Sequence, residues 1–276
     1  MQLIAAGKRE RIKSVVVDAR IVWIKRMDGE RPPLSAYLHR AISPLSPWAI
    51  FRGSRLVNHR EMVEREVRKT AAFANAGFPF ASILLDHGSS LVMSDAPGIV
   101  QNELDRLKPI DAKAHDRLLI ACAAALGRAH QAGLCHGRPH PRDMILDGGS
   151  IGFLDFEEAP EEVMPLADAQ ARDLWLIFLQ ISSQAILENT SRRALEAYCA
   201  KAPATVLPRL SAISGLFGAL HHVLRLAQPL KLGSDGRRLL KAIEFLRPAL
   251  AQARVEMKDK TLPGAAVAGR KSKAMQ

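Results

Sequence analysis

The 276 residues are enough for one large domain or for two lobes that share a core. Apolar residues make up 48% of the chain and charged residues 24%, close to the globular average, which excludes a largely disordered protein. Lysine and arginine outnumber aspartate and glutamate by 39 to 28. The resulting charge of +11 favours an anionic partner such as a nucleotide, a nucleic acid, lipid head groups or an acidic glycan. Any single lysine or arginine is as well explained by ordinary exposure on the protein surface.

The cysteines indicate a reducing compartment, because Cys122, Cys135 and Cys199 lie far apart and form no C-x-x-C pair. The N-terminus carries charges too early for a secretory signal. The most apolar run, residues 174–179, is far too short to cross a bilayer. We therefore expect a cytoplasmic protein whose positive charge also permits peripheral contact with the inner face of a membrane.

The first third of the chain predicts an antiparallel sheet and one helix. Apolar alternation and β-branched residues predict strands over the following segments: 2–6, 14–17, 21–26, 83–85 and 90–93. A helix is predicted from Asn58 to Ala76, where Asn58 and Glu61 form a capping box and Gly77 ends the helix. The prolines of residues 28–57 predict irregular structure before it.

The rest of the chain is predicted to be mainly helical. Residues 94–98 are rich in turn formers and indicate a linker between two lobes. Apolar periodicity then predicts helices over these segments: 112–132, 166–187, 191–200, 205–226 and 235–255. The predicted organisation is an N-terminal lobe over residues 1–95, a helical lobe over residues 96–256, and a basic disordered tail over residues 257–276. The predicted fold class is α+β, with a small antiparallel β lobe carrying one helix and a larger helical lobe.

Residues 136–158 carry the chemistry and read HGRPHPRDMILDGGSIGFLDFEE. Asp143 precedes one short apolar strand, Asp155 follows the next, and a turn at residues 147–149 joins the two strands. Carboxylates placed in this way on a hairpin can converge on one cation, and Mg²⁺ prefers such oxygen ligands. The stretch therefore predicts a phosphoryl-transfer site with Asp143 and Asp155 as metal ligands.

This order of elements and motifs resembles the protein-kinase-like superfamily. It most closely resembles the bacterial lipopolysaccharide-core (Kdo/heptose) kinases and the atypical small kinase of the tRNA-modifying KEOPS complex. The segment Ile21-Val22-Trp23-Ile24-Lys25 resembles the strand whose lysine holds nucleotide phosphates. In these families a glutamate of the following helix pairs with that lysine. Glu66 is the first candidate for that role here, Glu64 is the second, and Glu61 also competes.

The resemblance extends to a hinge, a D-F-G position and a bracing aspartate. Residues 91–98 resemble the hinge whose backbone binds adenine, which assigns Met93 and Asp95 to the nucleotide site. Asp155 occupies the D-F-G place, where glutamate replaces the glycine. Asp173 resembles the buried helix aspartate that braces the catalytic loop through hydrogen bonds. The resemblance thus implies ATP and Mg²⁺ as cofactors, with Lys25 orienting the phosphates.

The catalytic loop departs from the family pattern. The family reads H-G-D-x-H-P-x-N, so Arg138 stands at the place of the catalytic aspartate and Asp143 at the place of the asparagine. An arginine cannot accept a proton, but it can bind a phosphate, and Arg142 could assist it. His140 or a water molecule would then take the proton from the acceptor hydroxyl. The N-terminal glycine loop is also thin, with Gly7 as its one glycine.

Three functions stay open at this stage. We favour a divergent Mg²⁺-dependent phosphotransferase that acts on a lipopolysaccharide-core sugar or a protein Ser/Thr hydroxyl. The second is a pseudokinase that serves as a nucleotide-binding scaffold or regulator, because Arg138 argues against ordinary transfer. The third is a basic RNA- or membrane-associated module, which the 5% aromatic content makes the weaker choice for RNA.

Two other clusters are given ordinary structural roles. A zinc site or a Cys135 nucleophile is disfavoured, because the prolines near His136 and His140 prevent the presentation of side chains from one helix face. A partner Cys/His pair is also missing from the sequence. The glutamates between residues 157 and 162 are expected to form an exposed acidic turn.

Overall fold

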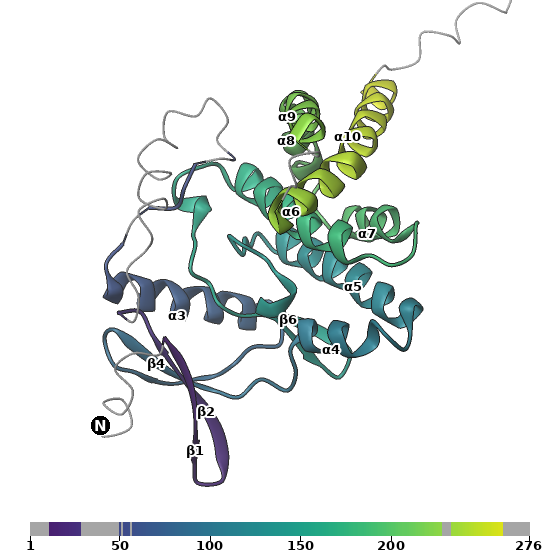
Figure 1. Ribbon diagram of the computed structural model, residues 1–276. Coiled ribbons are helices and arrows are strands. Elements are labelled where there is room, and N and C mark those ends of the chain that lie inside the picture. The colour runs from purple at the N-terminus through teal and green to yellow at the C-terminus, as the bar shows by residue number, and fades with distance from the viewer. Residues whose placement is uncertain (1–10, 29–49, 51, 56, 228–232, 262–276) are drawn as a thin grey trace, which may run out of the picture.

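The structure is a computed structural model that describes the chain apart from residues 1–10, 29–49, 51, 56, 228–232 and 262–276. A four-stranded antiparallel sheet and a helix form a small lobe, and helices packed around a hairpin form a larger lobe (Figure 1). The predicted α+β class is confirmed. The predicted strand over residues 2–6 and the thin glycine loop at Gly7 lie outside the described residues.

The sheet of the small lobe has the strand order β1-β2-β4-β3. Its members are β1 (Ile12–Val17), β2 (Arg20–Arg26), β3 (Ile83–Asp86) and β4 (Ser90–Ser94). Asp18 and Ala19 join β1 to β2 with φ angles of 49° and 60°, the left-handed conformation that a tight two-residue hairpin requires. Because Trp23 pairs with Met93, and Lys25 lies two residues further along β2, these three side chains share one face of the sheet.

Helix α3 (His59–Asn75) follows the predicted boundaries and capping. The Asn58 side chain accepts a hydrogen bond from the Glu61 backbone N–H, and the Glu61 carboxylate accepts one from the Asn58 backbone N–H. Gly77, with φ of 81°, follows the helix in the left-handed conformation that commonly ends one. The apolar side chain of Val63 packs against the sheet in the core of the small lobe.

The same helix also reaches the larger lobe. The ring of Phe73 lies 5.2 Å from that of Phe153 and 4.7 Å from that of Phe156, measured between centroids. Just beyond the helix, the backbone of Pro79 lies so close to Gly152 that a Cβ there would meet the Pro79 carbonyl oxygen at 1.9 Å. Only glycine fits at such an approach. Helix α3 is therefore anchored in both lobes, between the sheet and the hairpin.

The larger lobe contains helices, short 3₁₀ turns and a hairpin. Its elements are α4 (Val100–Leu107), α5 (Ala112–Gln131), η3 (Pro141–Asp143), β5 (Met144–Asp147), β6 (Ser150–Phe153), η4 (Pro160–Glu162), α6 (Leu166–Gln184), α7 (Thr190–Cys199), α8 (Val206–Ala212), α9 (Ser214–Ala227) and α10 (Ser234–Thr261). Helix α5 packs against α4 and α7, and α10 packs against α6, α8 and α9. The buried faces of α5 and α6 form the centre of the main hydrophobic core.

Three details differ from the sequence predictions. Helix α4 was not predicted, because its eight residues bury only Val100 and Leu104, too few to show a helical period. The predicted helix over residues 205–226 is divided at Ile213 into α8 and α9. Helix α10 continues to Thr261 and so enters the segment 257–276 predicted as a disordered tail, of which the remainder is not described. None of the described helices combines the length and apolar content needed to span a membrane.

Candidate active site

A cavity of about 290 Å³ lies between the sheet of the small lobe and hairpin β5–β6. Its walls are mostly apolar and include Ile12, Trp23, Ala81, Met93, Ile99 and Leu154. A few charged groups face into it, namely Lys25, Glu66, Asp95, Arg142, Asp143 and Asp155. An apolar cleft with a small number of convergent polar groups is the usual form of a small-molecule site.

Lys25 is the central charge of this cleft. Its Nζ lies 3.0 Å from Oε2 of Glu66 and also donates to a carboxylate oxygen of Asp155. Lys25 is 5% exposed and Glu66 is 1% exposed, so the pair is shielded from water. Burial alone would lower the pKa of the Lys25 ammonium, but the negative charges of Glu66 and Asp155 outweigh it and the pKa is raised. Lys25 is therefore a fixed cation at neutral pH.

The structure distinguishes the three glutamates that the sequence left open as partners of Lys25. Glu61 caps the start of α3, and Glu64 forms an exposed ion pair with Arg60 at 3.0 Å. Glu66 lies on the side of α3 that faces the sheet, three residues after the buried Val63. Glu66 is accordingly the glutamate that pairs with Lys25.

Asp155 directs its carboxylate into the cleft from the end of hairpin β5–β6. Its φ angle of 67° is uncommon for a residue that carries a Cβ, and such strained backbone clusters at functional sites. Burial would raise the pKa of Asp155, but the charge and hydrogen bond of Lys25 outweigh it and hold the pKa below its ordinary value. The carboxylate is therefore ionised at neutral pH.

Asp143 approaches the same point from η3. Its backbone carbonyl accepts a hydrogen bond from the Leu154 N–H at 3.0 Å, which joins η3 to the residue before Asp155. Burial, followed by the negative charge of Asp155, raises the pKa of Asp143 to about 7. Two carboxylates that repel each other in this way form a donor set suited to a shared cation.

The donor set fits Mg²⁺ with a nucleotide better than a closed metal site. Among the described residues, no three His, Cys, Asp or Glu side chains are placed to hold an ion by themselves. Mg²⁺ is commonly bound by one or two carboxylates together with phosphate oxygens and water. Asp143 and Asp155 would supply those carboxylates, and the ion would neutralise charge on the phosphates.

We expect the Mg²⁺-dependent nucleotide affinity to increase with pH, and Asp143→Asn to remove most of this dependence. The pKa of Asp143 is about 7 in the ligand-free protein, so at lower pH a proton must leave before the carboxylate binds the metal. The affinity should fall about tenfold per pH unit below 7. Titration calorimetry between pH 5 and 8 measures the affinity of both proteins. Protonation of the nucleotide affects both equally, so the difference between them reports Asp143. Equal slopes of log affinity against pH would contradict the expectation.

The stability of the ligand-free protein checks the same pKa shift. The pKa of Asp143 lies above its ordinary value of 3.8, so the folded state holds this proton more tightly than the unfolded chain. The stability that depends on Asp143 therefore decreases as the pH rises from about 4 to about 7. Asp143→Asn should exceed the wild type in unfolding free energy by about 4 kcal/mol at pH 8 and should match it near pH 4.

Arg138 brings a positive charge to the place where the family has a carboxylate. Its guanidinium lies 2.9 Å from Oε2 of Glu157 and 4.0 Å from Oδ2 of Asp155. The side chain is 43% exposed, so it can reorient toward a ligand in the cleft. The guanidinium cannot accept a proton but can bind phosphate oxygens.

The contacts of His140 favour a structural role over that of proton acceptor. Its Nδ1 accepts a hydrogen bond from the Arg142 backbone N–H at 3.1 Å, which caps η3. Burial, and then the positive charges of Arg142, Arg238 and Arg138, lower the pKa of His140 to about 4. At neutral pH the ring is thus uncharged, with its proton on Nε2 and its lone pair occupied.

The hinge candidates take different positions. Met93 of β4 lines the cavity, where its side chain is available to contact a base. The Asp95 carboxylate instead accepts a hydrogen bond from the Trp23 indole N–H at 2.7 Å. Trp23 was not singled out from the sequence, although its spacing of two from Lys25 on a strand placed both side chains on one face. It forms part of the cavity wall and is oriented by Asp95.

Asp173 braces the loop as predicted. It is fully buried in α6, and its two oxygens accept hydrogen bonds from the backbone N–H groups of His136 at 2.6 Å and Gly137 at 2.9 Å. The Cys135 thiol donates to the same carboxylate at 3.3 Å. Burial, and then the charge of Asp173, raise the pKa of the Cys135 thiol, which opposes a role as a thiolate nucleophile.

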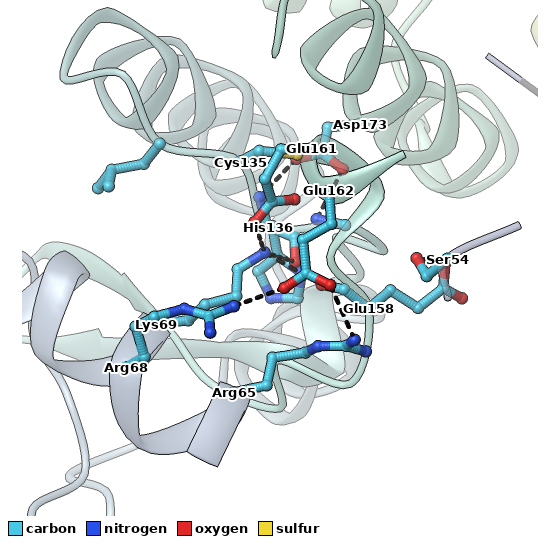
Figure 2. A network of polar contacts seen from close by, with 12 residues as sticks. Ser54, Arg65, Arg68, Lys69, Cys135, His136, Glu158, Glu161, Glu162 and Asp173 are labelled. Carbon is cyan, nitrogen blue, oxygen red and sulfur yellow. Dashed lines mark hydrogen bonds and ion pairs between the residues drawn. The ribbon is translucent and has the colours of Figure 1, made fainter. Parts of the chain in front are cut away.

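The expectation of an exposed acidic turn between residues 157 and 162 is wrong for three of its four glutamates, whereas Glu162 is exposed. The carboxylates of Glu158 and Glu161 are largely withdrawn from solvent and paired with Arg172 and Lys69, respectively. The segment lies against α3, as Figure 2 shows for Glu158, Glu161 and Glu162. Its charges are neutralised by basic groups that are distant in the sequence, and that pairing is invisible to a local pattern.

Comparison with known proteins finds likeness in structure only. No protein-family model matches the chain, and no curated protein matches it. The solved structure of WaaP in complex with acyl carrier protein has a TM-score of 0.47 and 16% identity, covering 82% of this chain and 87% of that chain. A MAP kinase from Leishmania major has a TM-score of 0.38 and 14% identity, covering 90% of this chain and 82% of that chain.

The chain's own architecture decides the fold class. A lysine on a central strand pairs with a glutamate of helix α3 in the small lobe, above an aspartate that follows a hairpin of the helical lobe. The fold is protein-kinase-like.

Proposed function

We propose that the chain binds ATP with Mg²⁺ in this cleft and transfers the terminal phosphoryl group to a hydroxyl acceptor. The observation that carries the proposal is the buried Lys25 ammonium, which lies between Glu66 and Asp155 at the wall of an apolar cavity. A cation fixed in this way can bind phosphate oxygens without reorganisation, and phosphoryl transfer depends mainly on such positioning.

In this proposal the remaining groups of the cleft have distinct tasks. Asp143 and Asp155 would hold Mg²⁺, and Met93 with the adjacent hinge would contact the adenine ring. Arg138 would bind the phosphoryl group in transit, because a loose transition state places negative charge on its oxygens. A carboxylate base contributes less to such a reaction than alignment does. Water would accept the hydroxyl proton, since the lone pair of His140 is occupied.

The proposed acceptor is a hydroxyl of a lipopolysaccharide-core sugar or of a protein Ser/Thr residue. The charge of +11 suits an anionic acceptor and would support peripheral contact with an anionic membrane surface from the cytoplasm. The same charge also supports RNA binding, for which the aromatic content of 5% offers few stacking groups.

A second candidate is a nucleotide-binding scaffold that does not transfer phosphate. The observation that favours it is the 2.9 Å ion pair between Arg138 and Glu157, which holds Arg138 at the place of the missing carboxylate. In this case nucleotide binding would set the relative position of the lobes, and a partner would sense that position.

Titration calorimetry with ATP, with and without Mg²⁺, tests nucleotide binding. We expect micromolar affinity with Mg²⁺ and at least about tenfold weaker affinity without it, because the carboxylates then repel the phosphates. Absence of binding heat in both conditions would contradict both candidates. Phosphoryl transfer from [γ-³²P]ATP then distinguishes the enzyme from the scaffold.

A further inference from the structure

Lys69 of α3 is a buried lysine whose hydrogen bonds reach into the larger lobe. Its Nζ lies 3.1 Å from the His136 carbonyl oxygen, 3.0 Å from the Glu158 carbonyl oxygen and 2.9 Å from Oε1 of Glu161 (Figure 2). The residue is 5% exposed. An ammonium has three N–H donors, and here each has one acceptor, so the buried charge is fully satisfied.

These three acceptors belong to two different parts of the site. His136 begins the catalytic-type loop that Asp173 braces from α6. Glu158 and Glu161 belong to the segment that leads from Asp155 to α6. One side chain of α3 therefore holds the helix against both the loop and this segment.

Two arginines of α3 extend the same contact toward the surface. Arg65 donates to the Glu157 carbonyl oxygen at 2.9 Å and to the Glu162 carboxylate at 3.2 Å. Arg68 donates to the other oxygen of Glu162 at 2.6 Å. Figure 2 shows the side chains of Arg65, Arg68 and Lys69 extending from one helix toward the glutamates of the neighbouring segment.

The register of α3 connects this contact to the cleft. Glu66 and Lys69 are three residues apart and both are buried, so they lie on neighbouring parts of one helix face. Any rotation or outward shift of α3 that released Lys69 would also move Glu66 away from Lys25. The position of the ion pair in the small lobe thus depends on contacts made in the larger lobe.

The anions of this segment are permanent. Residues 155–165 read DFEEAPEEVMP and contain no serine, threonine or tyrosine that could be phosphorylated. Phosphorylation orders a segment by adding an anion that pairs with basic side chains. Here the carboxylates of Glu161 and Glu162 already pair with Lys69, Arg65 and Arg68.

We infer that Lys69 is a positioning residue that clamps α3 to the catalytic-type loop and to residues 157–162, so that the chain's own carboxylates keep Glu66 on Lys25 without modification. The consequence for catalysis rests on the proposed function. The clamp itself is a property of the ligand-free protein and can be measured there.

The reactivity of Lys25 toward an amine-acylating reagent reports the clamp. In the wild type, Lys25 is 5% exposed and its Nζ is held by hydrogen bonds to Glu66 and Asp155, so it reacts slowly. In Lys69→Met, loss of the clamp should release Glu66 and accelerate Lys25 acylation about tenfold at pH 8, the order of effect expected for losing one hydrogen bond to a charged group. Peptide mass spectrometry measures the rate, with the exposed Lys13 as an internal reference.

Matched variants separate the clamp from general loosening. Arg60→Met removes an exposed ion pair at the start of the same helix and should leave the Lys25 rate unchanged. Glu66→Gln removes the partner itself and should accelerate acylation at least as much as Lys69→Met. Glu161→Gln keeps the lysine and removes one charge, so it should give a smaller increase and covers the case in which Lys69→Met does not fold. All rates are taken well below the melting temperature of each variant.

An unchanged Lys25 rate in a folded Lys69→Met or Glu161→Gln protein, beside an accelerated rate in Glu66→Gln, would overturn the inference. This outcome differs from a failure of the proposed function, which would appear as absent ATP binding in the wild type. Where ATP binds, Lys69→Met should also weaken it about tenfold while Arg60→Met does not, because only the former releases Glu66, which orients the Lys25 cation that holds the phosphates.

Discussion

Asp155→Asn should strongly weaken Mg²⁺-dependent ATP binding and leave the fold intact. The amide has the shape of the carboxylate but lacks the charge that a cation requires, and Asp155 is the candidate ligand that is ionised at neutral pH. We expect the dissociation constant to increase at least about 100-fold, equivalent to about 2.7 kcal/mol. Titration calorimetry measures the loss, and circular dichroism shows whether the protein remains folded.

The fold should tolerate this change because Lys25 retains Glu66 at 3.0 Å as a buried counter-ion. Asp147→Asn is the matched control, since Asp147 lies on the exposed turn of the same hairpin and does not line the cavity. Wild-type affinity in a folded Asp155→Asn protein would place the metal elsewhere and contradict the proposed site.

Arg138→Met should lower phosphoryl transfer about 100-fold with little change in ATP affinity. The proposed role of Arg138 is to stabilise charge that develops in the transition state, and removing one such donor typically costs about 10²- to 10³-fold in rate. Its guanidinium lies 4.0 Å from Asp155 and is partly exposed, so it can reach a phosphoryl group held there. Initial rates with [γ-³²P]ATP measure kcat, and calorimetry measures binding.

The charge-reversing variant decides between the two candidate functions. Arg138→Asp restores the carboxylate of the family pattern but places it beside Glu157, so we expect no gain of transfer over Arg138→Met. If the wild type is inactive and Arg138→Asp gains activity, the scaffold candidate is correct and Arg138 is the inactivating substitution. Arg192→Met, which breaks an exposed ion pair on α7, is the control and should leave both rate and affinity unchanged.

Local patterns in the sequence were sufficient for the elements and for several site residues. The capping box of Asn58 and Glu61 is read within four residues, and it placed the start of α3 correctly. The spacing of Asp143 and Asp155 around a turn predicted two carboxylates that approach one point, and both line the same cavity. These features depend on neighbours within one turn or one hairpin, which a linear pattern records.

The sequence narrowed the partner of Lys25 to three glutamates, and the tertiary structure was needed to choose among them. Glu61, Glu64 and Glu66 all belong to one helix, and only the direction of each side chain separates them. Glu66 follows the buried Val63 by three residues and therefore faces the sheet, whereas Glu64 faces solvent. The motif predicted a set of candidate glutamates, and the packing of α3 on the sheet selected Glu66 as the partner of Lys25.

The sequence by itself determined the α+β class, the two-lobe order, the Lys25 strand, the hairpin that carries Asp155, and the absence of a carboxylate at Arg138. Only the tertiary structure decided that Arg138 pairs with Glu157 and that Lys69 clamps α3 to the segment after the hairpin. Lys69 and Glu161 are 92 positions apart in the chain. Their pairing depends on how the two lobes meet, and glutamates that look like a solvated turn in the sequence become counter-ions of Lys69, Arg65 and Arg68 only when α3 lies against them.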